Sequence, residues 1–178
     1  MPKHVVLMCR EMAFPYLAEY LTSSNETLTV EWAKTVADLE RLTHPGALLI
    51  SFCQGVVVPE AILSRLLRPA YNIHPGSPEY PGYHPEVFAA AEGATRFGAT
   101  THEMAPVVDS GAIVDVEWFD VPPGADAITI GERAFVAAVE SFRRVGPWLA
   151  TKDEPLPRID AQWQGPFRTR AECLALRG

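Results

Sequence analysis

The sequence predicts an α/β fold built on an open, mostly parallel, Rossmann-like sheet with helices on both faces. Short apolar runs alternate along the chain with segments in which apolar residues recur every three or four positions. This alternation of strands and amphipathic helices is typical of parallel sheets with right-handed crossovers. In addition, polar side chains follow the third and fourth apolar runs directly, at the sheet edge where ligands bind in such folds.

The first half of the chain supplies four predicted strands and the helices between them. The apolar runs predict strands at residues 4–8, 28–32, 47–51 and 70–73. Helical spacing predicts helices over residues 11–21 and 36–42, and Pro59 is well placed to begin a third helix through residue 66.

The second half adds two further strands and the longest helix. Residues 84–92 look helical, and strands at 98–104 and 111–121 are joined by a turn around Asp109. A long apolar stripe predicts one helix over residues 127–149. We expect a catalytic domain over residues 1–150 and a C-terminal tail over 151–178, which is Pro-rich and then helical from residue 170 to 176.

Composition excludes several classes of partner. With 178 residues, 48% of them hydrophobic, the chain can bury one sizeable core. The net charge of −7 argues against nucleic acid, whose affinity for proteins rests on neutralising phosphates. No apolar stretch approaches the roughly 20 residues of a membrane span, and no signal peptide is evident. The three scattered cysteines form no C-x-x-C pair, so we expect a cytoplasmic protein without zinc or disulfides.

Two short motifs carry the three side chains that acyl transfer between nitrogens needs. Asn72 and His74 stand in Asn-Ile-His-Pro-Gly, where strand alternation puts both on one side of the strand. Asp109 follows 35 residues after His74. An amide can donate to an oxyanion, an imidazole can move protons near neutral pH, and a carboxylate can orient the imidazole. On the residues alone, a structural Asn and His at a strand end remain the alternative.

The sequence Asn72-Ile73-His74-Pro75 resembles the Asn-x-His-Pro signature of the folate-dependent formyltransferases. The family's Gly-x-Thr-x-His pattern is matched at residues 98–102, and its Asp-x-Gly-x-Ile pattern at residues 109–113, with the same spacing. Residues 50–59 look like its pterin-side loop. The resemblance covers roughly residues 3–145. The family includes glycinamide ribonucleotide transformylase, the N-terminal domain of methionyl-tRNA formyltransferase, the sugar N-formyltransferases and formyltetrahydrofolate hydrolase.

The resemblance implies 10-formyltetrahydrofolate as formyl donor and a role for each catalytic residue. Asn72 would donate to the oxyanion, a protonated His74 would help, and Asp109 would hold the imidazolium and relay protons to the leaving nitrogen. No metal is required. The implied pterin contacts are Gln54, Gly55, Val56 and Val57 after the third strand, and Ala105, Pro106 and Val107 before Asp109. For the two adjacent valines, simple core packing is an equal alternative.

Other polar residues near the motifs have simpler interpretations. His102 matches a family position and is expected to be structural, while His84 is expected to start a helix. Together with His74 and Asp109 they lack the H-x-H or H-x-x-x-H spacing that would favour a metal site. Arg10 and Glu11 could touch an acceptor, but a solvated helix start is the simpler interpretation.

Differences between this sequence and those of family members reduce the range of expected formyl acceptors. The segment after the first strand has no glycine, and Glu11 would repel a phosphate there, which argues against the purine intermediate. The acidic chain ends at residue 178 without a basic domain, so tRNA is not expected. A small amine remains, with an amino sugar as the leading candidate. The alternatives are a 10-formyltetrahydrofolate hydrolase and a non-catalytic folate-binding module. A monomer and a homodimer are both compatible with the pattern.

Overall fold

The computed structural model describes residues 4–177 and shows one six-stranded sheet with strand order β2-β1-β3-β4-β5-β6. The first four strands in this order run parallel, and β5 and β6 are antiparallel additions. The strands are β1 His4–Met8, β2 Thr29–Ala33, β3 Leu48–Phe52, β4 Tyr71–His74, β5 Arg96–Glu103 and β6 Ile113–Asp120. The expected α/β class with a mostly parallel sheet is therefore confirmed.

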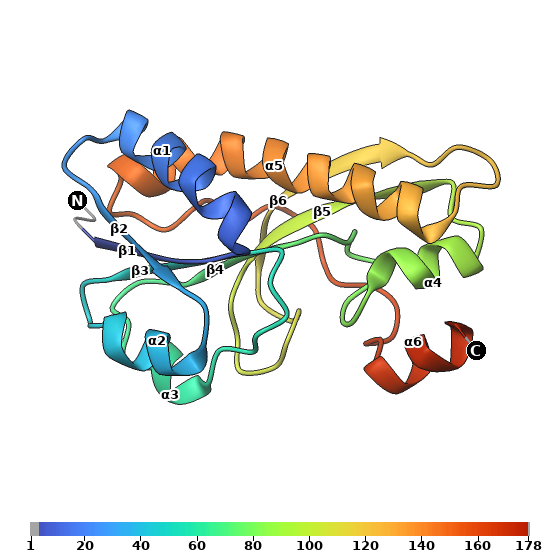
Figure 1. Ribbon diagram of the computed structural model, residues 1–178, viewed down its shortest axis with the longest axis horizontal. Coiled ribbons are helices and arrows are strands. Elements are labelled where there is room, and N and C mark those ends of the chain that lie inside the picture. Colours follow the sequence, from blue (N-terminus) through green and yellow to red (C-terminus); the bar gives the residue numbers. More distant parts are fainter. Residues whose placement is uncertain (1–3, 178) are drawn as a thin grey trace.

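Helices cover both faces of the sheet, as Figure 1 shows. One face carries α1 (Phe14–Ser24) after the short 3-10 turn η1 (Glu11–Ala13), together with α5 (Ala127–Thr151). The other face carries α2 (Val36–Leu42) and α3 (Glu60–Leu63). Two short helices, α4 (Pro85–Ala91) and α6 (Arg170–Arg177), lie together near the C-terminus of the chain.

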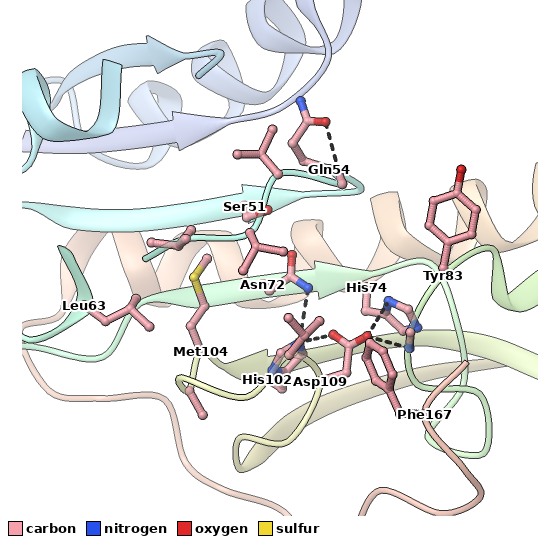
Figure 2. Close-up of a pocket in the computed structure, with 17 residues that line it drawn as sticks. Ser51, Gln54, Leu63, Asn72, His74, Tyr83, His102, Met104, Asp109 and Phe167 are labelled. Carbon is pink, nitrogen blue, oxygen red and sulfur yellow. Dashed lines mark hydrogen bonds and ion pairs between the residues drawn. The ribbon is translucent and has the colours of Figure 1, made fainter. Parts of the chain in front are cut away.

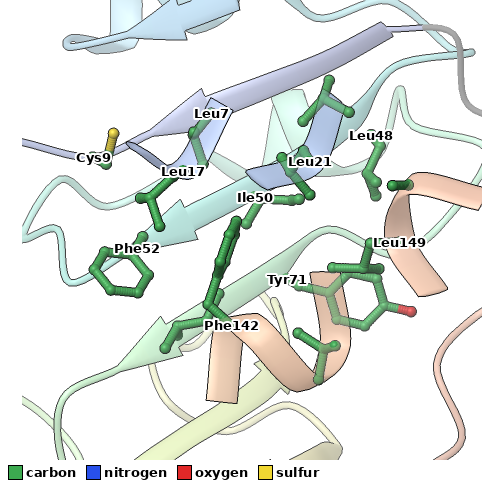
Figure 3. Close-up of a cluster of buried hydrophobic side chains, with 14 of the residues drawn as sticks. Leu7, Cys9, Leu17, Leu21, Leu48, Ile50, Phe52, Tyr71, Phe142 and Leu149 are labelled. Carbon is green, nitrogen blue, oxygen red and sulfur yellow. The ribbon is translucent and has the colours of Figure 1, made fainter. Parts of the chain in front are cut away.

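The main core lies between the sheet and the α1/α5 layer. Leu7, Ile50 and Phe142 are fully buried there, and Figure 3 shows them facing one another from two strands and a helix. All five residues of β3 are buried because this strand has neighbours on both sides and helices on both faces. Strands of this kind can be predicted well from an unbroken apolar run in the sequence.

The predicted helix over residues 59–66 is shorter than expected. The helix α3 ends at Leu63, and the amides of Arg65 and Leu66 bond to carbonyls only three residues back. Leu67 then donates its amide to the carbonyl of Pro45. Pro69 disfavours helical geometry at Arg68, so the helix does not resume before β4.

The longest helix extends slightly beyond its predicted end. The side chain of Asp126 accepts a hydrogen bond from the amide of Thr129 and so caps the start of α5. The helix then continues past Pro147 to Thr151, whose hydroxyl donates to the Pro147 carbonyl. Within residues 4–177, none of the helices combines the length and the apolar character needed to cross a membrane.

After α5 the chain returns across the sheet toward the carboxyl ends of the strands. We call residues 156–169 the strap. It starts where the amide of Leu156 bonds to the hydroxyl of Tyr71, 2.9 Å away, and it ends at α6, where Cys173 is fully buried against α4 and its neighbours. The strap thus joins two separate parts of the core.

Candidate active site

A cavity of about 210 Å³ opens where β3 and β4 end. Its walls come from the loop after β3, the loop after β4, the β5–β6 turn and one residue of the strap (Figure 2). Asn72, His74 and Asp109 all line it. The cavity therefore stands at the carboxyl edge of the parallel strands, where the sequence placed the site.

The strand β4 delivers two of the predicted catalytic side chains. Asn72 and His74 stand two residues apart and so point to the same side of the sheet, while Ile73 is buried on the other. The His74 side chain is buried, and its Nε2 donates to the carbonyl of Tyr80 at 3.0 Å. This bond leaves Nδ1 of the same ring facing Asp109, at 3.5 Å from Oδ2.

Asp109 reaches the cavity from the turn between β5 and β6. Its φ of +48° lies in the left-handed region, and its Oδ2 accepts a 2.8 Å hydrogen bond from the amide of Gly82. Burial alone would raise the pKa of this carboxyl. The positive potential of His74, the hydrogen bond from His102 and the Gly82 amide outweigh that effect, so the pKa of Asp109 lies below its ordinary value. Asp109 is thus a carboxylate at neutral pH.

His102, which was expected to be structural, lines the cavity with Asn72, His74 and Asp109, and we call these four side chains the polar group. The Nδ1 of His102 donates to the carbonyl of Glu103 at 2.8 Å, and its Nε2 lies 3.1 Å from Asn72 Nδ2 and 3.3 Å from Asp109 Oδ1. A neutral ring can accept from Asn72, and a protonated ring can donate to Asp109. The signal in the sequence was positional, because His102 pairs directly with Asn72 across the antiparallel β4–β5 ladder.

The structure places some of the predicted pterin contacts in the cavity lining and others outside it. Gln54, Gly55, Val56, Val57 and Ala105 line the cavity. Pro106 and Val107 are absent from its lining, and Val107 is 68% exposed. The oxygen of Gln54 accepts from the amide of Gly55 at 3.0 Å, so this side chain braces its own loop.

The cavity has two ends of different character (Figure 2). Leu63 and Met104 stand at one end, and both belong to the same apolar cluster as Val56 and Val58. Tyr83 and Phe167 stand at the other end, beside His74, and these residues are 40% and 48% exposed. Tyr83 was not predicted to belong to the site, whereas the sequence left open whether the tail segment 163–170, which carries Phe167, covers the acceptor site or pairs subunits. The polar group lies between an aliphatic end and an aromatic end.

The remaining polar candidates lie outside the cavity lining. His84 has a φ of +49°, and its Nδ1 lies 2.6 Å from Glu86 Oε1 at the start of α4. Arg10 and Glu11 are exposed at the start of η1. Among the residues that the structure describes, no three His, Cys, Asp or Glu side chains are arranged to hold a metal ion.

Comparisons with known proteins agree with this fold. In structure, the chain is similar to a 4-N formyltransferase from Francisella tularensis (16% identity, TM-score 0.75, 96% of this chain and 77% of that one). It is also similar to an N-formyltransferase from Helicobacter canadensis, solved with folinic acid and dTDP-3-aminofucose (14%, 0.74, 97% and 72%). A third similar structure is the formyltransferase PseJ from Anoxybacillus kamchatkensis, solved with a UDP-linked formamido sugar and tetrahydrofolate (18%, 0.73, 97% and 88%). The three TM-scores show a shared fold.

Similarity in sequence identifies the family. A trifunctional purine biosynthetic protein adenosine-3 from Drosophila pseudoobscura pseudoobscura is 36% identical over 81 residues, which are 45% of this chain but only 6% of that protein. The family model described as formyl transferase matches residues 22–145, which is more than half of the chain. The chain therefore belongs to the formyl transferase family.

Proposed function

We propose that this protein transfers a formyl group from 10-formyltetrahydrofolate to a primary amine of a small acceptor. The observation that carries the proposal is the convergence of Asn72, His74 and Asp109, from two segments, on one cavity. Two similar structures, from Helicobacter canadensis and Anoxybacillus kamchatkensis, were solved with folates and nucleotide-linked sugars, which supports the same pairing of substrates here.

The aliphatic end of the cavity suits the pterin ring of a folate. Leu63, Val58 and Met104 offer apolar surface for the faces of a flat heterocycle. The loop from Gln54 to Val57 adds backbone groups at the rim, and a methyl group added at Gly55 would meet no atom within 4 Å. When bound, 10-formyltetrahydrofolate supplies the formyl carbon that the acceptor amine attacks.

Asn72 and His74 stabilise the negative charge that develops on the formyl oxygen. The Nδ2 group of Asn72 now donates to His102 Nε2. If His102 is protonated, its Nε2 turns to Asp109 and the amide N–H of Asn72 becomes free for the oxyanion. A protonated His74 adds positive charge at the same place, beside the Asp109 carboxylate.

Asp109 transfers the proton that must move during the reaction. A bond forms between the acceptor nitrogen and the formyl carbon, and the bond from that carbon to the folate nitrogen breaks. One proton must therefore pass from the acceptor nitrogen to the folate nitrogen. The Asp109 carboxylate is ionised, buried and held by the Gly82 amide, so it can take this proton and return it, directly or through water.

The aromatic end of the cavity suits a sugar as the carrier of the amine. Tyr83 and Phe167 offer partly exposed rings against which the apolar face of a sugar ring can pack. Among the described residues that line the cavity there is no lysine or arginine to pair with a phosphate or carboxylate. An uncharged amino sugar moiety therefore fits this end better than an anionic group does.

A direct assay tests the proposal. Purified protein is incubated with 10-formyltetrahydrofolate, and tetrahydrofolate is followed by absorbance, first alone and then with a panel of amino sugars and amino acids. We expect release that depends on an amino sugar. Release in water alone would identify a hydrolase instead, and folate binding without release would identify a binding module.

Two variants test the assigned residues. His74→Ala and Asp109→Asn should each lower turnover by at least about 10²-fold, because each removes charge stabilisation from the transition state. Folate binding, measured by calorimetry, should persist in both variants because the aliphatic end is unchanged. Near wild-type turnover in either variant would refute the assignment.

A further inference from the structure

The strap crosses directly over the polar group of the cavity and is tied down along its length. The amide of Gln164 donates to the carbonyl of Pro78 at 2.8 Å, and the amide of Arg168 donates to the carbonyl of Pro81 at 2.9 Å. The Arg168 carbonyl in turn accepts from the amide of Tyr83 at 2.8 Å. The strap therefore packs against the loop that follows Asn72 and His74.

One strap residue, Trp163, contacts three parts of the site at once. Its Nε1 donates to the carbonyl of Gly111 at 2.9 Å, in the turn that carries Asp109. Its ring meets the His102 ring edge-to-face, with centroids 5.0 Å apart and planes at 86°. It meets the His74 ring in the same manner, at 5.8 Å and 68°.

The contacts of Trp163 help to hold the two imidazole rings in place, because the direct interactions between the catalytic groups are long. Asp109 lies 3.5 Å from His74 and 3.3 Å from His102, which is longer than a well-aligned charged hydrogen bond. Otherwise the His74 ring is held by the carbonyl of Tyr80, and the His102 ring by the carbonyl of Glu103 and by Asn72 Nδ2. A ring packed against both imidazoles restricts their rotation and fixes which nitrogen of each faces Asp109.

We propose that Trp163 is a positioning residue for the reaction, which holds His74, His102 and the Asp109 turn in one arrangement. This inference rests on the proposed function. Trp163 lies beyond the segment 22–145 that the family model matches, so membership of the family does not assign it a role. With this role for Trp163, the strap contributes to the arrangement of the catalytic groups.

The experiment compares two substitutions at Trp163 with one at a remote tryptophan. Trp163→Phe keeps an aromatic ring and loses the hydrogen bond, whereas Trp163→Leu removes both. Trp118→Leu, on the edge strand β6 beside Arg96, is the matched control. For each variant we would measure kcat, both KM values, the thermal midpoint and the long-range nitrogen–proton NMR spectrum of the imidazoles. With only 5 histidines in the chain, that spectrum is readily assigned.

We expect Trp163→Leu to lower kcat by about 10²-fold, as misplacement of catalytic groups does, with KM for folate little changed. Trp163→Phe should recover most of that loss. In the spectra, His74 and His102 should each show one fixed pattern of protonated nitrogens in the wild type and in Trp163→Phe, and a mixture in Trp163→Leu. The Trp118→Leu control should match the wild type in kcat and in both patterns.

Two results would overturn the proposal. One is a Trp163→Leu protein with wild-type kcat and an unchanged imidazole pattern. The other is a loss confined to KM with kcat intact, which would make Trp163 a binding residue. If the wild type transfers no formyl group, the proposed function fails by itself. The imidazole pattern then still decides whether Trp163 orders the two rings.

Discussion

The loops that follow β3 and β4 leave neighbouring parallel strands and meet at the same cavity, yet they are packed very differently. In the loop after β4, a methyl group added at Gly76 would come within 2.5 Å of His74 Nε2, and one at Gly82 would overlap the backbone of Arg168. In the loop after β3, a methyl group at Gly55 would meet no atom within 4 Å, and Val57 is 58% exposed.

This difference in packing corresponds to two proposed roles, formyl transfer for the packed loop after β4 and pterin binding for the open loop after β3. The groups proposed to act on the formyl carbon sit on or against the packed loop, where the strap and the β5–β6 turn fix its path. The groups proposed to hold the pterin sit on the open loop, which is free to adjust to a ligand. We therefore expect substitutions in the packed loop to cost far more than matched substitutions in the open one.

The largest effect on stability is expected at Gly82. Its φ of +107° already disfavours a side chain, and an alanine methyl group would also overlap Arg168. Gly93→Ala is the matched control, since Gly93 has a φ of +65° with no atom within 4 Å. The control should lose about 1–3 kcal/mol of unfolding free energy from backbone strain alone. Gly82→Ala should lose clearly more and also lower kcat, because the Gly82 amide holds Asp109.

Urea unfolding followed by circular dichroism measures both variants. Equal losses at Gly82 and Gly93 would show that the strap yields to the added methyl group. That outcome would undermine the contrast between a packed and an open loop.

A smaller effect should appear in the pH dependence of stability. The pKa of Asp109 is lower in the folded chain than its ordinary value of about 3.9, so the unfolded state binds the proton more readily. Its ionisation therefore stabilises the fold above about pH 4, and this contribution is lost as the pH falls through the folded-state pKa. The stability difference between wild type and Asp109→Asn should stay constant above about pH 5 and shrink as the pH falls below about 4.

Denaturant unfolding at several pH values gives that difference. A gap that stays constant over the whole range would mean that the charge of Asp109 contributes nothing to the packed side of the cavity. The packed loop would then rest on backbone contacts alone.

The sequence predicted those features that short stretches determine by themselves. The buried strand β3 follows from its unbroken apolar run, and Asn72 and His74 share a side because alternation puts them there. The predicted extent of α3 was wrong. The chain beyond its last turn is held by a hydrogen bond from Leu67 to Pro45, a distant contact that no local pattern shows. No local pattern shows which residues of a Pro-rich tail will return to a strand end. On the sequence alone, the polar-aromatic segment 163–170 could either cover the acceptor site or pair subunits, and only the structure shows that Phe167 lines the cavity and that Trp163 packs against His74 and His102.

The smallest effect is expected in the open loop. An alanine at Gly55 would add a methyl group to empty space, and the φ there does not require glycine. We therefore expect Gly55→Ala to change unfolding free energy by less than about 0.5 kcal/mol, as exposed substitutions usually do. Any change in activity should appear in KM for folate and leave kcat unaltered, since this loop lies apart from the groups that act on the formyl carbon. Steady-state kinetics separates the two constants. A fall in kcat at Gly55 comparable to that of a His74 variant would mean that the open loop shares in the chemistry, and that packing does not divide the tasks of the two loops.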